Sequence, residues 1–173
     1  TGAAFNTGEG EVTWTASSTI AAGTVVTINN FGSTPVSNLG TTSGSSGLST
    51  GSEIVYAYVG APGVPTAFLA AITNNGFTAD GGTLDGTGLV AGTTAIDLAV
   101  VDVGADIGVF NGARNGQSSY AGFLAQINDP ANWLTQDTAS DDSIDSVAPD
   151  LPFSVAGFTL GSAEVQSVGF GSA

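Results

Sequence analysis

The residues best suited to chemistry are carboxylates in a polar stretch late in the chain, residues 137–150. Two or three of them, together with backbone carbonyl oxygens, would supply the hard oxygen ligands that calcium prefers. The spacing differs from that of an EF-hand loop, so calcium binding is a hypothesis drawn from composition and clustering. The alternative is a solvated loop, because aspartate is also a favoured turn residue. The candidate ligands are Asp137, Asp141, Asp142 and Asp145, and Asp150 closes the stretch.

The residue types that most catalytic centres use are missing. The chain has no Cys and no His, and Arg114 is its only Lys or Arg residue. This composition excludes catalytic triads, Schiff-base and phosphate-loop lysines, and zinc sites with His or Cys ligands. Paired carboxylates remain, and these suffice for glycoside hydrolysis. Glu9, Glu11 and Glu53 are the candidates, but Glu9 lies in a turn and Glu11 on the polar face of an alternating strand. We therefore expect solvated carboxylates and no catalytic activity.

Four aromatic side chains offer a different kind of site. Trp14, Tyr56, Tyr58 and Trp133 have the amphipathic rings from which sugar-binding platforms are built. Packing in the core is the alternative use of the same residues, and their strand and helix periodicity favours it. A calcium-dependent binding module, with carbohydrate or adhesion as its role, is therefore the second functional hypothesis.

Charge and hydropathy exclude several partners. Fifteen acidic residues and one basic residue give a formal net charge of -14, which would repel nucleic acid phosphates and anionic lipids. No apolar run approaches the roughly 18 residues of a membrane-spanning helix. We expect neither nucleic acid binding nor membrane insertion. The absence of Met, even at position 1, suggests that the chain begins after processing or was cut from a longer precursor.

One segment, residues 117–134, has the spacing of an amphipathic helix. Its apolar residues fall at i, i+3, i+4 and i+7, namely Tyr120, Phe123, Leu124 and Ile127. Ser118 or Ser119 is expected to cap its start, and Asn128 in a left-handed conformation its end. Asp129 should then cap a second short turn that begins with Pro130 and directs Trp133 and Leu134 at the same core.

The rest of the chain predicts strands and turns. Alternating or β-rich runs predict strands over residues 11–16, 24–30, 52–59, 153–160 and 164–170. Residues 67–73 are an apolar run that fits a short buried strand or a helical turn, and we favour the strand. Residues 35–50, rich in Gly, Ser and Thr, predict a long surface loop. Because 173 residues suit one domain, we predict a single mainly β domain over 1–173, an antiparallel β-sandwich with one packed α-helix.

The sequence also resembles a known kind of module. Phe5–Ala16 reads FNTGEGEVTWTA, residues 20–26 read IAAGTVV, and Asp129–Trp133 reads DPANW. These phrases, with the stretch 153–160, resemble a β-sandwich module of secreted bacterial multidomain proteins that is similar to the lamin-tail-like domains. The resemblance implies an extracellular or cell-surface location and the sandwich fold, and it carries no catalytic residues.

The chain departs from that module at its ends. Such modules open with a strand that would lie upstream of Thr1, whereas residues 164–170, EVQSVGF, look like this strand placed at the C-terminus. One hypothesis is that the segment 162–173 completes a neighbouring subunit's sheet and builds a homo-oligomer or filament. The alternatives are that it pairs within its own sheet or that the chain was trimmed. We therefore expect a structural module of a surface layer or filament.

Overall fold

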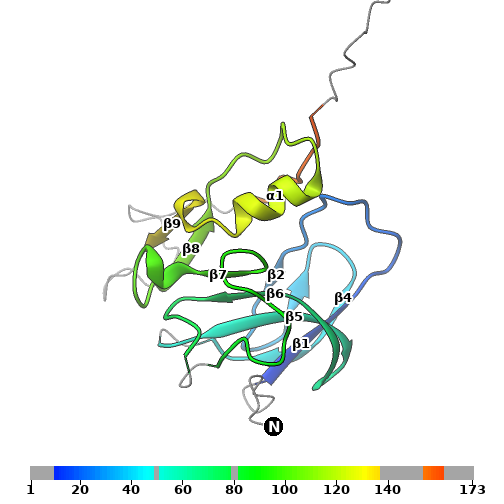
Figure 1. Ribbon diagram of the computed structural model, residues 1–173. Coiled ribbons are helices and arrows are strands. Elements are labelled where there is room, and N and C mark those ends of the chain that lie inside the picture. Colours follow the sequence, from blue (N-terminus) through cyan, green and yellow to red (C-terminus); the bar gives the residue numbers. More distant parts are fainter. Residues whose placement is uncertain (1–9, 49–50, 79–81, 137–153, 162–173) are drawn as a thin grey trace, which may run out of the picture.

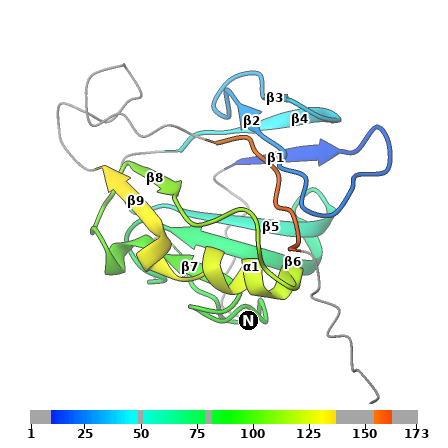
Figure 2. The same cartoon turned by 90° about the horizontal axis from the view of Figure 1, so that it is seen from above.

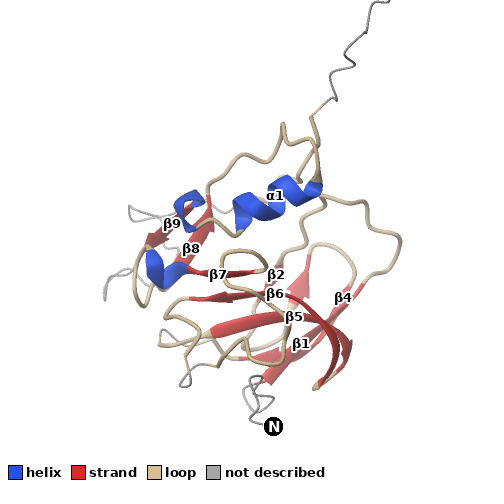
Figure 3. Cartoon of the chain, in the orientation of Figure 1, coloured by secondary structure: helices blue, strands red, loops and turns tan. Residues whose placement is uncertain are grey.

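The computed structural model describes residues 10–48, 51–78, 82–136 and 154–161. Strands dominate and a single α-helix packs beside them, so the predicted fold class is confirmed (Figure 3). No helix in these ranges is both long enough and apolar enough to cross a membrane. The strands are β1 Gly10–Thr15, β2 Ile28–Asn29, β3 Val36–Ser37, β4 Thr41–Ser46, β5 Ile54–Ala61, β6 Val64–Thr73, β7 Ala95–Asp97, β8 Ile107–Phe110 and β9 Trp133–Gln136. The helix is α1 Tyr120–Ile127, and two 3-10 turns are η2 Leu98–Val100 and η3 Pro130–Asn132.

The strands β1 to β4 form one layer, seen above β5 and β6 in Figure 2. β1 pairs antiparallel with β4, from Gly10 opposite Ser46 to Thr15 opposite Thr41, and β2 pairs with β3. The predicted surface loop over residues 35–50 is therefore wrong, because it holds both β3 and β4. The sequence of β4 is TTSGSS, whose side chains show no apolar alternation, but its backbone groups pair as in any strand. The strand predicted over residues 24–30 shrinks to β2.

The second layer is the three-stranded sheet β5-β6-β7. β5 and β6 are joined by a tight turn at Pro62 and Gly63, and Gly63 has the positive φ of 67° that such turns require. β7 pairs in parallel with the end of β6, where Ala71 lies opposite Ala95. The strands predicted over residues 52–59 and 67–73 are confirmed as β5 and β6.

The buried core is concentrated from Ala71 onward. Ala71, Leu89 and Ala95 form one buried cluster, against which Ile54, Tyr56, Phe68, Phe77 and Leu84 pack. The other buried hydrophobic residues are Ile96, Leu98, Ala105, Ile107, Val109 and Phe123. In the described residues before Ala71, only Pro35 is buried.

The helix α1 begins and ends as the sequence predicts, with one difference. The Ser119 hydroxyl accepts a hydrogen bond from the Gly122 N–H at 3.3 Å, so the predicted cap is confirmed. Asn128 ends the helix with φ −86°, so the left-handed cap is wrong; its side-chain amide instead donates to the Leu124 carbonyl oxygen. Of the apolar stripe only Phe123 is buried, while Tyr120 and Leu124 are 41% and 42% exposed.

The turn η3 follows at once. The Asp129 carboxylate accepts from the Ala131 N–H at 3.0 Å and Pro130 opens the turn, as predicted. Trp133 begins β9 and packs edge-on against Phe110 of β8, with 5.8 Å between the ring centroids. Leu134, predicted to face the core, is 42% exposed. β8 pairs with the distant β9 and not with a strand that follows it directly.

Residues 154–161 run alongside two other segments without forming a regular strand. The Phe158 N–H donates to the Gly23 carbonyl oxygen at 2.7 Å, and a single bridge joins Asn115 to Thr159. The strand predicted over residues 153–160 is therefore wrong within the described part. Arg114 reaches this segment: its guanidinium lies 4.9 Å from the Phe158 ring centroid and donates to the Ala156 carbonyl oxygen at 2.8 Å.

Candidate binding cleft

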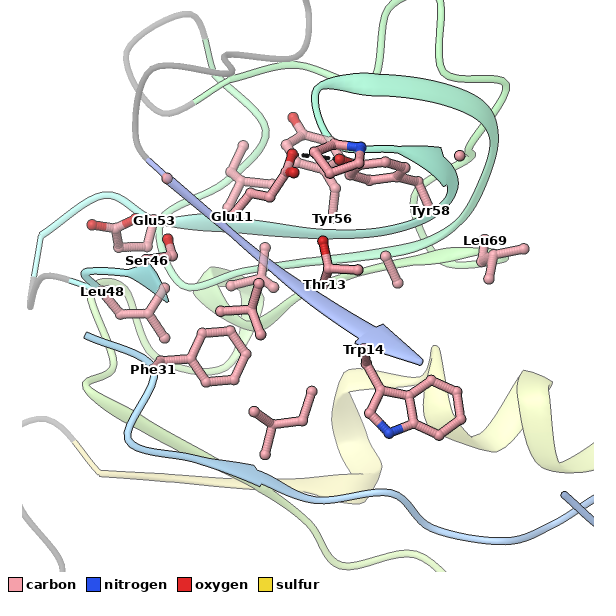
Figure 4. Close-up of a pocket in the computed structure, with 18 of the residues that line it drawn as sticks. Glu11, Thr13, Trp14, Phe31, Ser46, Leu48, Glu53, Tyr56, Tyr58 and Leu69 are labelled. Atoms are coloured by element: carbon pink, nitrogen blue, oxygen red, sulfur yellow. Dashed lines mark hydrogen bonds between the residues drawn. The ribbon is translucent and has the colours of Figure 1, made fainter. Parts of the chain in front are cut away.

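A cleft of about 590 Å³ lies between the two layers of strands (Figure 4). β1 borders it on one side and β5 on the other, and residues from the chain around β2 and β4 close one end. Apolar side chains make up most of its walls. The lining residues that matter below are Glu11, Val12, Thr13, Trp14, Phe31, Leu48, Glu53, Tyr56, Tyr58, Val59 and Leu69.

The cleft follows the edges of strands and not only their faces. Side chains of a strand alternate between its two faces, so a cleft over one face meets every second residue. Here the lining contains the unbroken runs 10–14 of β1 and 53–60 along β5. Unbroken runs are expected where a cleft passes along a strand's edge, where backbone N–H and C=O groups point outward.

Glu11 crosses the cleft and ties the two layers together. Its carboxylate accepts a hydrogen bond from the Tyr58 hydroxyl at 2.5 Å and another from the Gly63 N–H at 2.7 Å. Desolvation raises the pKa of the Tyr58 phenol, and the hydrogen bond to Glu11 raises it further, because both disfavour the phenolate. The prediction that Glu11 is a solvated surface carboxylate is therefore wrong, since Glu11 is half-buried and doubly hydrogen-bonded.

Two bulges in β6 lie beside this contact, because the pairing of β5 with β6 skips Leu69 and Thr66. The register between β5 and β6 shifts between Ala57 and Tyr58 and again between Val59 and Gly60. Such irregularities bend a strand and re-aim its side chains. Figure 4 shows the Tyr58 hydroxyl beside the Glu11 carboxylate, although the two residues lie on different layers. Sequence spacing gave no signal for this pair, which is 47 positions apart.

Three of the four candidate aromatic residues line the cleft. The Tyr56 hydroxyl donates to the Thr83 carbonyl oxygen at 2.9 Å, and burial raises the pKa of this phenol. The Trp14 indole N–H donates to the Leu39 carbonyl oxygen at 2.5 Å, and Figure 4 places this ring at the opposite end of the cleft from Glu53. Trp133 lies apart, against Phe110. The four rings therefore do not form one platform.

Two of the three candidate glutamates reach the cleft, but they point to different places. Figure 4 shows Glu53 beside Ser46, whereas Glu11 is turned toward Tyr58. Glu9 and the calcium candidates Asp137, Asp141, Asp142 and Asp145 lie outside the described residues. Within residues 10–48, 51–78, 82–136 and 154–161, no three acidic side chains come together as a metal site.

Two residues that line the cleft were not predicted from the sequence. Phe31 lies shortly before the stretch predicted as a loop and Leu48 lies inside it, and both line the cleft beside β1. They are isolated apolar residues among Gly, Ser and Thr, so no periodicity marks them. The only signal was their hydrophobicity in a polar neighbourhood.

Comparison with known proteins adds no relative to this description. No protein-family model, curated protein or solved structure matches the chain. The resemblance to lamin-tail-like modules therefore stays a prediction from the residues quoted above. Functional inference rests on the cleft and on the chemistry of its walls.

Proposed function

We propose that the chain is an extracellular structural module that assembles with copies of itself into a surface layer or filament, and that it has no catalytic activity. The supporting observation is the open apolar cleft between the two layers of strands. In a self-contained β-sandwich, side chains from the two inner faces interdigitate and fill this space. Here the space is about 590 Å³, so contact with another molecule would bury apolar walls that the described residues leave accessible.

The exposed hydrophobic residues also support a contact surface at the cleft. Leu48, Val59 and Leu69 all line the cleft and are 55%, 53% and 56% exposed. Single exposed hydrophobic residues are common on soluble proteins, but a contiguous group rimmed by polar residues marks a contact surface. Figure 4 places Leu48 and Leu69 at opposite ends of the cleft, so these residues support a protein partner because they line one cleft and not because they form one patch.

The charge distribution limits how the copies can meet. A net charge of -14 makes two copies repel each other at long range. Contacts must therefore form through surfaces that carry little charge, and only two of the lining residues, Glu11 and Glu53, are charged. Assembly through the cleft should strengthen as salt screens the repulsion between the bodies of the two copies.

The test is the assembly state of the whole chain. Light scattering after gel filtration and negative-stain microscopy should detect oligomers or filaments that increase with protein concentration and with salt. Leu69→Glu should abolish them, because it places a charge on the cleft wall. Val64→Glu is the matched control: Val64 lies in the same strand and is 62% exposed but does not line the cleft. A chain that stays monomeric under all these conditions would contradict the proposal.

A second function is favoured by the aromatic residues of the cleft. Its volume falls within the range of about 300–1,000 Å³ typical of ligand sites, and Trp14, Tyr56 and Tyr58 line it. A calcium-dependent carbohydrate-binding module would use these rings, with calcium bound by Asp137, Asp141, Asp142 and Asp145. Glycan-array binding that is lost with a chelator and in Trp14→Ala would support this function. Binding that survives the chelator would separate the sugar site from calcium.

A further inference from the structure

We propose that the cleft is the acceptor for residues 164–170 of a second copy, which add as a strand to the outer edge of β1. This inference rests on the proposed self-assembly and names its partner segment and its site. Four observations support it: the edge of β1, the length of the cleft, the chemistry of the segment, and the position at which the described chain ends.

β1 has one edge available for a further strand. Among the described residues it pairs with β4 alone, in a two-stranded sheet. In an antiparallel pair, hydrogen-bonded and non-bonded residue pairs alternate, so every second residue of β1 directs its N–H and C=O groups away from β4. That outer edge borders the cleft, as the unbroken lining run 10–14 indicates. An added strand would satisfy these backbone groups.

The cleft has the length of a short strand. The cleft runs beside five residues of β1 and eight residues along β5, which extend about 17 Å and about 26 Å at about 3.3 Å per residue, and a seven-residue segment spans about 23 Å. The cleft is therefore elongated along two strands, which suits an extended peptide better than a compact ligand.

The segment 164–170 has the side chains that the cleft requires. In EVQSVGF the residues alternate, so Gln166, Val168 and Phe170 share one face of a strand. Val168 and Phe170 would enter the apolar cleft beside Leu69. The only charge is Glu164 at the end of the segment, so its centre brings no charge near Glu11.

The position of Gly161 favours a second copy over insertion into the same molecule. Gly161 is the last described residue, and its N–H donates to the Gln117 carbonyl oxygen at 2.9 Å, just before α1. In Figures 1 and 2 the sheet of β5 and β6 lies between α1 and β1. The segment that follows Gly161 therefore starts on the far side of that sheet from the cleft. Insertion into a neighbour would give a head-to-tail arrangement, which extends into a filament when the rotation does not close.

The test uses disulfide trapping, because the chain has no cysteine of its own. One population carries Thr13→Cys on β1, and others carry single cysteines at Val165, Gln166, Ser167, Val168 or Gly169. Mixed pairs are oxidised with dissolved oxygen and copper–phenanthroline, which takes two thiols to one disulfide. We expect cross-linked dimers at alternate positions of the segment, as a paired strand requires. Val100→Cys, which is 73% exposed and outside the cleft, is the control and should give none.

The outcomes separate this inference from the proposed function. Oligomers that persist while no segment position cross-links to Thr13→Cys would overturn the inference and leave self-assembly standing. Cross-links that form only within one chain carrying both cysteines would place a molecule's own segment in the cleft and would also overturn it. Further single cysteines within residues 1–9 test whether the stretch before β1 occupies the cleft, and cross-links from these positions in place of the segment positions would also overturn the inference.

A second measurement uses the unmodified chain, so it does not depend on how the variants fold. A synthetic peptide with the sequence of residues 164–170 should compete for the cleft and reduce assembly at least tenfold at saturation. A peptide of the same composition with its apolar residues out of alternation is the control and should leave assembly unchanged. Equal effects of the two peptides, or no effect of either, would overturn the inference.

Discussion

The layer formed by β1 to β4 and the region from β6 onward are built from similar strands but are held together differently. From Ala71 onward, nine hydrophobic residues are buried, and Ala95 is completely inaccessible. The β1–β4 layer pairs its backbone regularly but buries only Pro35 among its described residues. Regular strand pairing therefore does not by itself produce a core.

The difference comes from side-chain volume. β4 is TTSGSS, which gives its layer hydrogen-bonded backbone but almost no apolar surface to bury. The apolar residues of β1, Val12 and Trp14, face a cleft that the described residues do not fill. Hydrogen bonds join the layer to the rest at Glu11, which bonds Tyr58 and Gly63, and in the β1–β2 connection, where Gly23 accepts from Phe158. We infer that it opens at a lower free energy than the region around Ala95.

The largest expected effect is in the well-buried region. Phe123→Ala removes a ring that is 2% exposed and packs 5.1 Å from the Phe158 ring centroid. Loss of a buried aromatic ring costs about 3–5 kcal/mol of unfolding free energy. Leu124→Ala, on the same helix but 42% exposed, is the control and should cost about 1 kcal/mol or less. Chemical denaturation measures both, and similar losses would contradict the burial of Phe123.

The same contrast explains what the sequence could predict. The helix and the strands β5 and β6 were predictable, because residues packed on one side leave a periodic apolar pattern. Phe123 and Ile54 lie where that periodicity places them. The caps Ser119 and Asp129 were predictable too, because their hydrogen bonds are local in sequence.

The β1–β4 layer and the cleft were largely unpredictable for a physical reason. β4 is a strand because its backbone pairs with that of β1. Its side chains do not alternate between apolar and polar, so the sequence gives no sign of this pairing. Tyr58 reaches Glu11 from the other layer, at a point where β6 bulges against β5, and nothing local in the sequence marks that approach. The burial of α1 was overestimated. An apolar stripe shows which face of a helix can pack against the protein, but it does not show how many residues of that face other elements bury.

A glycine substitution tests the β1–β4 layer alone. Gly44 has φ +81°, and a Cβ added there would overlap with the Glu11 carbonyl oxygen. Gly44→Ala should therefore cost about 1–3 kcal/mol and remove hydrogen-exchange protection from β1 and β4. Gly47→Ala is the control, because nothing lies within 4 Å and its φ is ordinary. If protection in β6 and β7 falls equally, the two regions unfold as one unit and the contrast between them is wrong.

A third prediction concerns the only cation. Arg114 contacts the rings of Phe110 and Phe158 and donates to the Ala156 carbonyl oxygen, so it fixes residues 154–161 onto β8. Arg114→Gln should cost about 1 kcal/mol and increase exchange in residues 154–161. Arg114→Lys keeps the charge but loses the planar contact, so it should recover only part of the loss. Full recovery by Lys would mean that charge alone matters.

The smallest expected effect is a pH dependence of the link between the two layers. The pKa of the Tyr58 phenol is raised by desolvation and then by its bond to Glu11, and burial raises the pKa of Tyr56. An unfolded tyrosine ionises near pH 10. Above that pH the unfolded chain loses protons that the folded chain still holds, so stability falls as pH rises through the folded pKa values.

The amino-acid composition makes the titration of the tyrosines easy to measure separately. The chain has three tyrosines and no Cys, Lys or His, so tyrosines are the only side chains that titrate near pH 10. Tyrosinate absorbance should therefore show ionisation above pH 10 for part of the folded signal, and denaturation should show a small alkaline loss of stability. Tyr58→Phe removes the hydroxyl donor to Glu11 and should flatten this loss, whereas a matching change at Tyr120 leaves Glu11 bonded to Tyr58. An unchanged alkaline slope in Tyr58→Phe would mean that the link contributes nothing to holding the β1–β4 layer in place.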